Sequence, residues 1–406
     1  MDYIKRNLVN KIKHLMTMFP AVVLLGARQV GKSTILRNTL PGAQIFDLEN
    51  EQDFLLAEHD PLVIFNEYAK PIIFDEAQMS HNLFKALRVE IDKTRENGQF
   101  LLSGSSSPAL LGNISETLAG RVAILEIPCL DFAESHATKS SHFLKNIAHL
   151  EKIKDLKPLC SLENVFESCL YGGYPQPFIL RRDLDFFDTW FENYFKTYID
   201  RDIRALFPTL KLDSFKKFIR MMARSSGEII NYSDYARSLD VSQPTIKKYF
   251  EIADGTFIWR MQPSYAKNSK KTVIKMPKGH FRDSGLLCYL MNINTVEELQ
   301  NHPQFGRIWE SFIIEQILKM TNLFYAKYEY YFYRTKAQAE IDLILEGRFG
   351  RIPIEIKSGI STGQKQIISL KNFVKDNACP FAIVINRGEE VKMLAEKVIQ
   401  IPVNYI

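Results

Sequence analysis

The stretch GARQVGKS at residues 26–33 decides the fold of this 406-residue chain. It follows the apolar run AVVLL at residues 21–25 and matches in full the pattern glycine, four residues, glycine, lysine, then serine or threonine. Where a buried strand turns through such a loop into a helix, backbone N–H groups and the helix N-terminus face a bound phosphate group. The sequence therefore predicts a phosphate-binding loop at the carboxyl end of a strand.

Each position of this loop has an expected role in binding ATP. Gly26 and Gly31 allow a close backbone approach, Lys32 reaches the β- and γ-phosphates, and Ser33 ligates Mg²⁺. The alternative, a glycine-rich turn that binds nothing, is disfavoured by the complete match and its flanks. The expected nucleotide-binding residues are Gly26, Ala27, Arg28, Gln29, Val30, Gly31, Lys32, Ser33 and Thr34.

A second motif, PIIFDEAQ, ends an apolar run in two adjacent carboxylates. We expect Asp75 to hold Mg²⁺, directly or through water, and Glu76 to orient and polarise the attacking water. Adjacent carboxylates after a strand can also cap a helix. About 40 residues after a phosphate-binding loop, the catalytic interpretation is favoured, and it predicts a site that hydrolyses ATP.

Two later segments supply further candidate catalytic residues. The run QFLLSGSSSP ends in small hydroxyl side chains at a position suited to sensing the γ-phosphate; Ser103, Ser105 and Ser106 are candidates, and Ser105 is favoured. Arg121, in LAGRV, lies between a predicted helix and a predicted strand. It could stabilise the transition state in the site of a neighbouring subunit, or form a salt bridge or cap a helix.

These stretches together resemble a known family. FPAVVLLGARQVGKST, PIIFDEAQ, FLLSGSSSPALL and LAGRV, with YGGYPQPF and YIDRDI further on, resemble prokaryotic AAA-type P-loop ATPases that carry a C-terminal domain of unknown function. The resemblance implies ATP and Mg²⁺ as cofactors and assembly into ring-shaped homo-oligomers such as hexamers. It implies little about the substrate on which the ATPase acts.

The chain has a net charge of +5 and 46% hydrophobic residues, which permits nucleic-acid binding without requiring it. No signal peptide or membrane-spanning run is apparent, so a cytoplasmic protein without a membrane partner is expected.

Successive apolar runs separated by amphipathic segments predict an α/β protein: a P-loop NTPase with a parallel sheet, a helical and winged-helix region, and an α/β restriction-nuclease-like domain. The expected domains are 1–130 (ATPase core), 131–212 (helical lid or connector), 213–285 (winged helix) and 286–406 (nuclease-like).

The stretch YSDYARSLDVSQPTIKKYFEIAD has the apolar spacing of two helices packed around a turn. On the second helix, Gln243, Thr245, Lys247 and Lys248 are expected near the solvent face, where they could contact DNA. The segment after it predicts a basic wing, and winged helices also serve as protein-binding modules or ATPase lids. The lysines of this expected wing are Lys267, Lys270, Lys271, Lys275 and Lys278.

Near the C-terminus, AEIDLIL and IPIEIKS predict two strands joined by a turn. Side chains alternate along a strand, so Glu340 and Asp342 share one face of the first strand, and Glu355 and Lys357 share one face of the second. Asp342, Glu355 and Lys357, with Glu310 on a preceding helix, resemble the core of PD-(D/E)xK nucleases, which cleave DNA with a bound metal ion. The alternative is a salt-bridge network on a binding platform.

Three functions stay open from the sequence. The first is an oligomeric ATPase that binds and remodels DNA through its winged helix and nuclease-like domain. The second is an ATP-controlled, metal-dependent DNA endonuclease in defence or repair. The third is a signalling or scaffold ATPase whose C-terminal domain binds protein.

Overall fold

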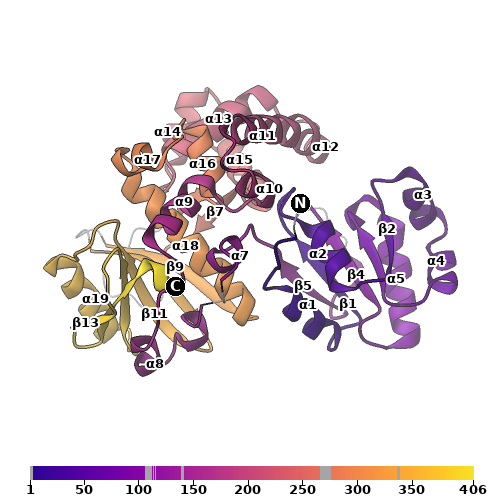
Figure 1. The fold of residues 1–406 in the computed structure, drawn as a ribbon. Coiled ribbons are helices and arrows are strands. Elements are labelled where there is room, and N and C mark those ends of the chain that lie inside the picture. Colours follow the sequence, from indigo (N-terminus) through magenta and orange to yellow (C-terminus); the bar gives the residue numbers. More distant parts are fainter. Residues whose placement is uncertain are drawn as a thin grey trace. The chain divides into compact units, whose positions relative to one another are not determined.

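The computed structural model describes residues 3–105, 112, 114, 116–138, 141–265, 276–335 and 339–406. The chain divides into two compact units (Figure 1). The first comprises Met1–Cys129 with Gly255–Ile258, and the second comprises Leu130–Asp254 with Trp259–Ile406. Among the described residues, none of the helices combines the length and the apolar character that crossing a membrane requires.

The first unit is built on a sheet of five parallel strands, in the order β2-β3-β4-β1-β5. β1, β3 and β4 are buried throughout, as expected for apolar runs inside a parallel sheet. The parallel α/β fold predicted from the apolar runs is therefore confirmed. The strands are β1 (Ala21–Leu25), β2 (Gln44–Asp47), β3 (Ile72–Asp75), β4 (Phe100–Gly104) and β5 (Val122–Glu126).

The strand order positions the site. Because β4 lies between β1 and β3, the residues that follow β4 lie between the loop after β1 and the carboxylates at the end of β3. Their carboxyl ends meet at one edge of the sheet, the usual place for a ligand in such folds. The helices of this unit include α1 (Val9–Met16), α2 (Lys32–Thr39), α3 (Glu51–His59), α4 (Pro61–Glu67), η1 (Ala77–Met79) and α5 (His81–Thr94).

The second unit begins with a helical region. It contains α7 (Phe132–Ser135), η2 (Leu144–Asn146), α8 (Leu150–Lys154), α9 (Leu162–Tyr171), α10 (Pro175–Ile179), α11 (Leu184–Thr197), the π-helix η3 (Tyr198–Ile203) and α12 (Arg204–Leu206). The glycine pair of YGGYPQP lies between α9 and α10. Gly172 has φ +70°, and a Cβ there would lie 2.6 Å from the backbone nitrogen of Gly285. Gly173 donates its N–H to Asp283 Oδ2 at 2.8 Å, so the pair serves close packing.

Next come three helices and a small antiparallel sheet in the order β6-β8-β7. They are α13 (Leu212–Arg224), β6 (Glu228–Ile229), α14 (Tyr232–Leu239), α15 (Gln243–Gly255), β7 (Trp259–Gln262) and β8 (Lys278–Phe281). Phe218 is fully buried, and its ring packs against those of Tyr235, Tyr249 and Phe250. These aromatic contacts hold α13, α14 and α15 together.

The C-terminal part carries a mixed six-stranded sheet in the order β13-β14-β12-β11-β10-β9. β9, β10 and β11 are antiparallel, as predicted for the hairpin, whereas β11, β12 and β14 are parallel. The elements are α16 (Ser284–Leu290), α17 (Val296–Asn301), α18 (Phe305–Phe324), β9 (Tyr328–Arg334), β10 (Glu340–Gly347), β11 (Gly350–Ile356), α19 (Gln364–Asp376), β12 (Ala382–Asn386), β13 (Lys392–Ala395), β14 (Val398–Pro402) and η4 (Val403–Tyr405).

A β-bulge interrupts β10 beside its carboxylate. Ile341 pairs with Tyr333 and Ile344 pairs with Tyr331, so Asp342 and the residue after it oppose a single residue of β9. Ile341 and Ile344 both enter one core cluster, and the strict alternation predicted for this strand is wrong at this point. Bulges re-aim side chains and are common beside functional sites.

A buried ion network joins this part to the small sheet. Arg260 on β7 donates to both carboxylate oxygens of Glu315 on α18, and His280 on β8 lies 2.9 Å from Glu315 Oε1. Burial alone would raise the pKa of Glu315, but the two partners lower it far below its usual range. Burial lowers the pKa of His280, so the neutral ring donates its N–H to an ionised carboxylate.

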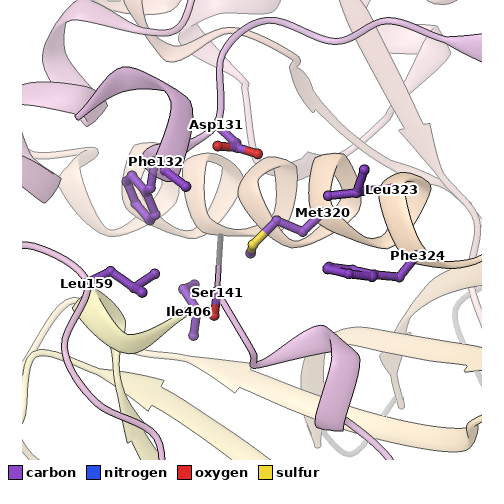
Figure 2. A pocket seen from close by; sticks show the side chains of 9 residues that line it. Asp131, Phe132, Ser141, Leu159, Met320, Leu323, Phe324 and Ile406 are labelled. Atoms are coloured by element: carbon purple, nitrogen blue, oxygen red, sulfur yellow. The ribbon is translucent and has the colours of Figure 1, made fainter. Parts of the chain in front are cut away.

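A small gap lies beside α18 in the second unit (Figure 2). Its volume is about 10 Å³, at the lower limit for one water molecule. This gap is therefore too small to bind a ligand. It is lined by Asp131, Phe132, Ala133, Ser141, Leu159, Met320, Leu323, Phe324 and Ile406.

Candidate functional site

The phosphate-binding loop has the backbone that its glycines allow. It leaves β1 at Leu25 and enters α2 at Lys32. Gly31 has φ 91°, a left-handed conformation that glycine adopts without strain, and Gln29 has φ 65°. Gly26 packs directly against the backbone carbonyl of Ile127, where any side chain would collide.

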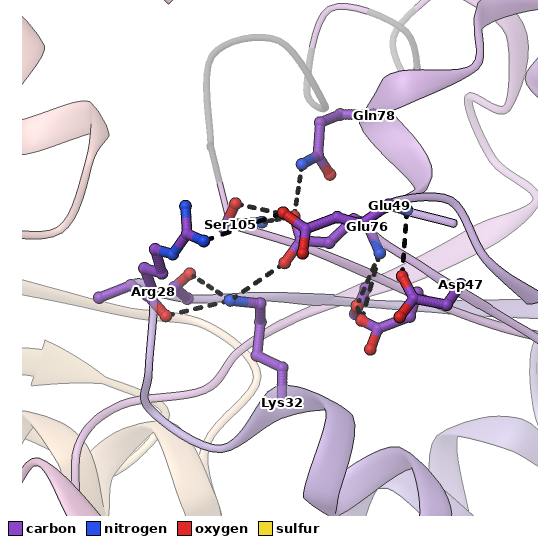
Figure 3. A network of polar contacts seen from close by, with 11 residues as sticks. Arg28, Lys32, Asp47, Glu49, Glu76, Gln78 and Ser105 are labelled. Atoms are coloured by element: carbon purple, nitrogen blue, oxygen red, sulfur yellow. Dashed lines mark hydrogen bonds and ion pairs between the residues drawn. The ribbon is translucent and has the colours of Figure 1, made fainter. Parts of the chain in front are cut away.

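Lys32 is buried, and its ammonium is held over the loop (Figure 3). Its Nζ donates to the carbonyl oxygens of Gly26 at 3.2 Å and Ala27 at 3.0 Å. It also lies 3.9 Å from Glu76 Oε1. The structure therefore brings the lysine of the loop close to the carboxylate that follows β3.

Asp75, the last residue of β3, has a buried carboxylate. Its Oδ1 accepts hydrogen bonds from the Ser103 hydroxyl on β4 and from the Glu76 N–H at 3.2 Å. Ser33 is exposed in the first turn of α2. A carboxylate and a hydroxyl are hard oxygen donors of the kind that Mg²⁺ prefers, so these two residues fit the expected metal ion.

Glu76 follows β3 in a left-handed conformation with φ 52°. Its Oε2 accepts hydrogen bonds from Gln78 Nε2 at 2.5 Å, from Ser105 Oγ at 2.8 Å and from Ser105 N at 3.2 Å (Figure 3). Burial raises the pKa of Glu76, but the Lys32 charge and these hydrogen bonds outweigh burial and lower it. The carboxylate is therefore ionised at neutral pH and can accept a proton.

Two of the candidate sensor serines contact different carboxylates of the site. Ser105, the favoured candidate, bonds to Glu76, and Ser103 bonds to Asp75. Ser106 lies outside the described residues. Sequence reasoning singled out Ser105 because small hydroxyl residues end β4, but the carboxylate that it contacts depends on the strand order.

Two residues at this site were missed by sequence reasoning. Gln78 is part of the motif PIIFDEAQ but was not assigned a role. It follows Glu76 by two residues, and this short spacing could have indicated a contact between the two side chains. Arg6 is buried and donates to the carbonyl oxygens of Val30 at 2.9 Å and Pro128 at 2.6 Å. Nothing near Arg6 in the sequence points to the loop, because the contact spans 24 residues.

Arg121 lies away from the loop of its own chain. It immediately precedes β5, which runs parallel to β1, whereas the loop follows the other end of β1 at Leu25. The length of strand separates them, about 13 Å at about 3.3 Å per residue. Arg121 instead pairs with Asp92 on α5 through two hydrogen bonds, at 2.7 and 2.9 Å. A role in the site of another subunit stays a prediction.

The candidate DNA-contact residues of α15 are placed as follows. Gln243, Lys247 and Lys248 are exposed, and Thr245 is half-buried. Lys247 Nζ lies over the ring of Tyr232, 5.6 Å from its centroid. Lys267, Lys270 and Lys271 lie outside the described residues, as does Lys275.

The predicted C-terminal carboxylates come together in the second unit. Asp342 on β10 accepts a hydrogen bond from the N–H of Ile356 on β11 at 2.8 Å. Lys357 Nζ donates to Glu355 Oε1 at 2.6 Å, while Glu355 Oε2 is buried without a hydrogen-bond partner. Burial raises the pKa of Glu355, the charge of Asp342 adds to the effect, and Glu310 on α18 contributes as well. The structure thus brings together all four predicted members of this cluster.

Lys278 corrects the sequence interpretation. It was expected on the exposed basic wing, but it is buried at the start of β8, and its ammonium contacts Glu310 and lies 3.5 Å from Glu340 Oε1. The pattern of lysines suggested a charged surface, because the carboxylates that surround Lys278 come from distant parts of the sequence. Arg334 at the rim lies 3.7 Å from Glu340.

The carboxylates of this cluster are close together and largely buried, and both effects raise their pKa values. Burial raises the pKa of Glu310 to about 7, the charge of Asp342 adds to the effect, and Lys278 opposes it. Burial likewise raises the pKa values of Asp342 and Glu355. Burial lowers the pKa of Lys278, but the carboxylates, led by Glu310, outweigh it, so the ammonium stays charged.

Family models match three segments of the chain. Residues 18–136 match a family described as an AAA domain. Residues 162–297 and 305–406 match two families described as domains of unknown function (DUF8612 and DUF4143). The chain therefore has a P-loop AAA domain in its first unit, followed by a helical region and a C-terminal domain with a mixed sheet.

Similar proteins cover most of the chain. It is 28% identical over 405 residues to uncharacterized proteins of Mycobacterium tuberculosis and Mycobacterium bovis, covering 99% of this chain and 84% of each relative. Among solved structures, a Walker-type ATPase of Pyrococcus abyssi has 16% identity and a TM-score of 0.42, over 71% of this chain and 96% of that chain. A signal-transduction ATPase of Pyrococcus horikoshii with a tetratricopeptide-repeat sensor has 12% identity and a TM-score of 0.28, over 79% and 49%.

Proposed function

We propose that the first unit hydrolyses ATP. The observation that carries the proposal is the meeting of Lys32, Asp75 and Glu76 at the carboxyl ends of β1 and β3, with Ser105, which follows the intervening β4, bonded to Glu76. A loop lysine for the phosphates, a carboxylate for the metal ion and an ionised carboxylate for the water are the parts that ATP hydrolysis needs.

The residues divide the work as follows. The N-terminus of α2 and the N–H groups of the loop bind the β- and γ-phosphates, and Lys32 moves from the loop carbonyls onto them. Glu76 accepts a proton from the water that attacks the γ-phosphate. Asp75 and Ser33 would hold Mg²⁺, which neutralises phosphate charge when bound. Ser105 fixes the Glu76 carboxylate, so its position is set before the water arrives.

Two variants test this proposal by separating binding from hydrolysis. Lys32→Ala should weaken ATP binding by at least about 100-fold, because the phosphates lose their buried cation. Glu76→Gln should bind ATP within about threefold of the wild type but hydrolyse it at least about 100-fold more slowly. Equilibrium binding of a fluorescent ATP analogue and phosphate release measure the two effects. Full turnover by Glu76→Gln would refute the role of Glu76.

As a second candidate function, we propose that the second unit contacts DNA. The order α13, β6, α14, α15, β7, β8 with an antiparallel sheet supports a winged helix, and α15 exposes Gln243, Lys247 and Lys248. The order α18, β9, β10, β11, α19, β12 supports the proposed nuclease-like core. ATP hydrolysis in a homo-oligomer would then act on DNA held by the second unit.

A charge reversal on α15 tests DNA contact. Lys247→Glu with Lys248→Glu should weaken duplex binding about tenfold or more and reduce its salt dependence by about two phosphate contacts. Fluorescence anisotropy over a series of salt concentrations measures both. Lys85→Glu with Lys93→Glu makes the same charge change on exposed lysines of α5 in the first unit and is the matched control. Equal losses in the two pairs would leave only a general charge effect and refute the proposed contact.

A further inference from the structure

The carboxylate cluster of the second unit contains a cation from another sheet. Lys278 belongs to β8, whereas Glu310 belongs to α18 and Glu340 to β10. The ammonium contacts Glu310 and lies 3.5 Å from Glu340, and only 4% of Lys278 is exposed. A charge this deeply buried is tolerated only where opposite charges surround it. The negative charges of Glu310 and Glu340 therefore stabilise the buried ammonium of Lys278.

The same cluster has bonding capacity that the lysines do not use. Glu355 is 3% exposed, and its Oε1 accepts from Lys357, but its Oε2 has no hydrogen-bond partner. Leaving a buried carboxylate oxygen unpaired is costly, and such oxygens are the ligands that Mg²⁺ and Mn²⁺ bind. Yet within the described ranges no three acidic, histidine or cysteine side chains are placed to hold one metal ion.

The reason for this mismatch is the position of Lys278. Lys278 contacts Glu310 and Glu340, and Lys357 contacts Glu355. Glu310, which would complete a metal site with Asp342 and Glu355, instead bonds to Lys278. An ammonium and a divalent cation that share one carboxylate repel each other.

We propose that Lys278 is a resident cation that excludes a divalent metal ion from Glu310, Asp342 and Glu355. The donor set suits Mg²⁺ or Mn²⁺, because it consists of carboxylate oxygens alone. Since Lys278 is the first residue of β8, the metal ion gains Glu310 as a ligand only when this end of β8 moves away. Metal binding at the cluster is thereby coupled to the position of the small sheet β6-β8-β7.

Metal binding to the full-length protein tests this proposal, with Mn²⁺ alone as the probe. Calorimetry and the loss of the free Mn²⁺ paramagnetic resonance signal report occupancy without any reaction. Lys278→Met should lower the Mn²⁺ dissociation constant at least about tenfold relative to the wild type. Adding Asp342→Asn should abolish the gain, because the phosphate-binding loop does not use Asp342. Equal affinity in the wild type and Lys278→Met would overturn the proposal, as would a gain that survives Asp342→Asn.

Two further variants separate the position of Lys278 from its charge. Lys278→Met with Glu340→Gln removes one charge of each sign, keeps the net charge of the cluster and should also bind Mn²⁺ more tightly. Arg334→Met removes a partly exposed cation beside Glu340 and should leave Mn²⁺ affinity within about twofold. A gain in Arg334→Met equal to that in Lys278→Met, or none in the double variant, would overturn the proposal.

Folding of these variants is informative in itself. Removing Lys278 leaves buried carboxylates uncompensated, which destabilises the protein, and a metal ion that binds the folded state should restore stability. Mn²⁺ should therefore raise the melting temperature of Lys278→Met more than that of the wild type. Failure of both Lys278 variants to fold, even with Mn²⁺ present, would make Lys278 an irreplaceable structural cation and refute the exclusion of a metal ion.

Discussion

Gln78 is the residue through which the state of Glu76 can be tested. Its Nε2 donates to Glu76 Oε2 at 2.5 Å, and it belongs to η1 and not to the loop that binds the phosphates. Gln78→Ala should therefore lower kcat for ATP hydrolysis about tenfold and leave KM for ATP within about twofold, because positioning of the general base is lost while ATP binding is kept. Steady-state phosphate release over a range of ATP concentrations measures this split.

A charged variant adds a readout that a structural role would not move. Gln78→Glu places a carboxylate beside Glu76, and a like charge raises the pKa of its neighbour. Since Glu76 must be ionised to accept a proton, the acid limb of the kcat–pH profile should move to higher pH. Gln52→Ala, an exposed glutamine on α3, is the control. Wild-type kcat in Gln78→Ala, with an unmoved profile in Gln78→Glu, would exclude a positioning role.

At the scale of elements, the sequence predicted the parallel sheet of the first unit but not the order of its strands. Apolar runs predicted β1, β3 and β4, because both faces of the parallel sheet are buried at these strands. The place of β4 between β1 and β3 is set by crossovers of the chain, which periodicity does not reveal. For that reason Ser105 could be chosen from the sequence, but its bond to Glu76 could not.

In the carboxylate cluster too, the sequence predicted contacts within one hairpin but not contacts between distant segments. Asp342, Glu355 and Lys357 lie on one predicted hairpin, where alternation brings them together. Lys278 is 32 residues from Glu310 and 62 from Glu340. The local sequence shows that Lys278 is charged, but it does not show whether the side chain is buried. The bulge in β10 was also hidden, because AEIDLIL reads as regular alternation.

At the scale of the whole molecule, Arg121 raises the question of a second copy. If Arg121 enters the site of a neighbour, Arg121→Ala should lower ATP hydrolysis at least about 100-fold. Mixing it with Lys32→Ala, which keeps Arg121 but has a defective loop, should restore part of the rate, measured as phosphate release across mixing ratios.

The partner of Arg121 supplies the control for this experiment. Asp92→Asn removes one charge of the pair and should leave hydrolysis near the wild-type rate, since Arg121 is then still present. If Arg121→Ala is never rescued at any mixing ratio, and Asp92→Asn is equally inactive, the pair is structural.

The buried network around Glu315 has a consequence for how this chain can be inherited. Consider another gene that acquired from this one only the segment after residue 285. It would gain α18 with Glu315 but would not gain Arg260 or His280. The new protein would bury a carboxylate without its cation, a change that costs several kcal/mol. Recombination within the second unit is therefore penalised at this junction, and β7, β8 and α18 are expected to pass between genomes together.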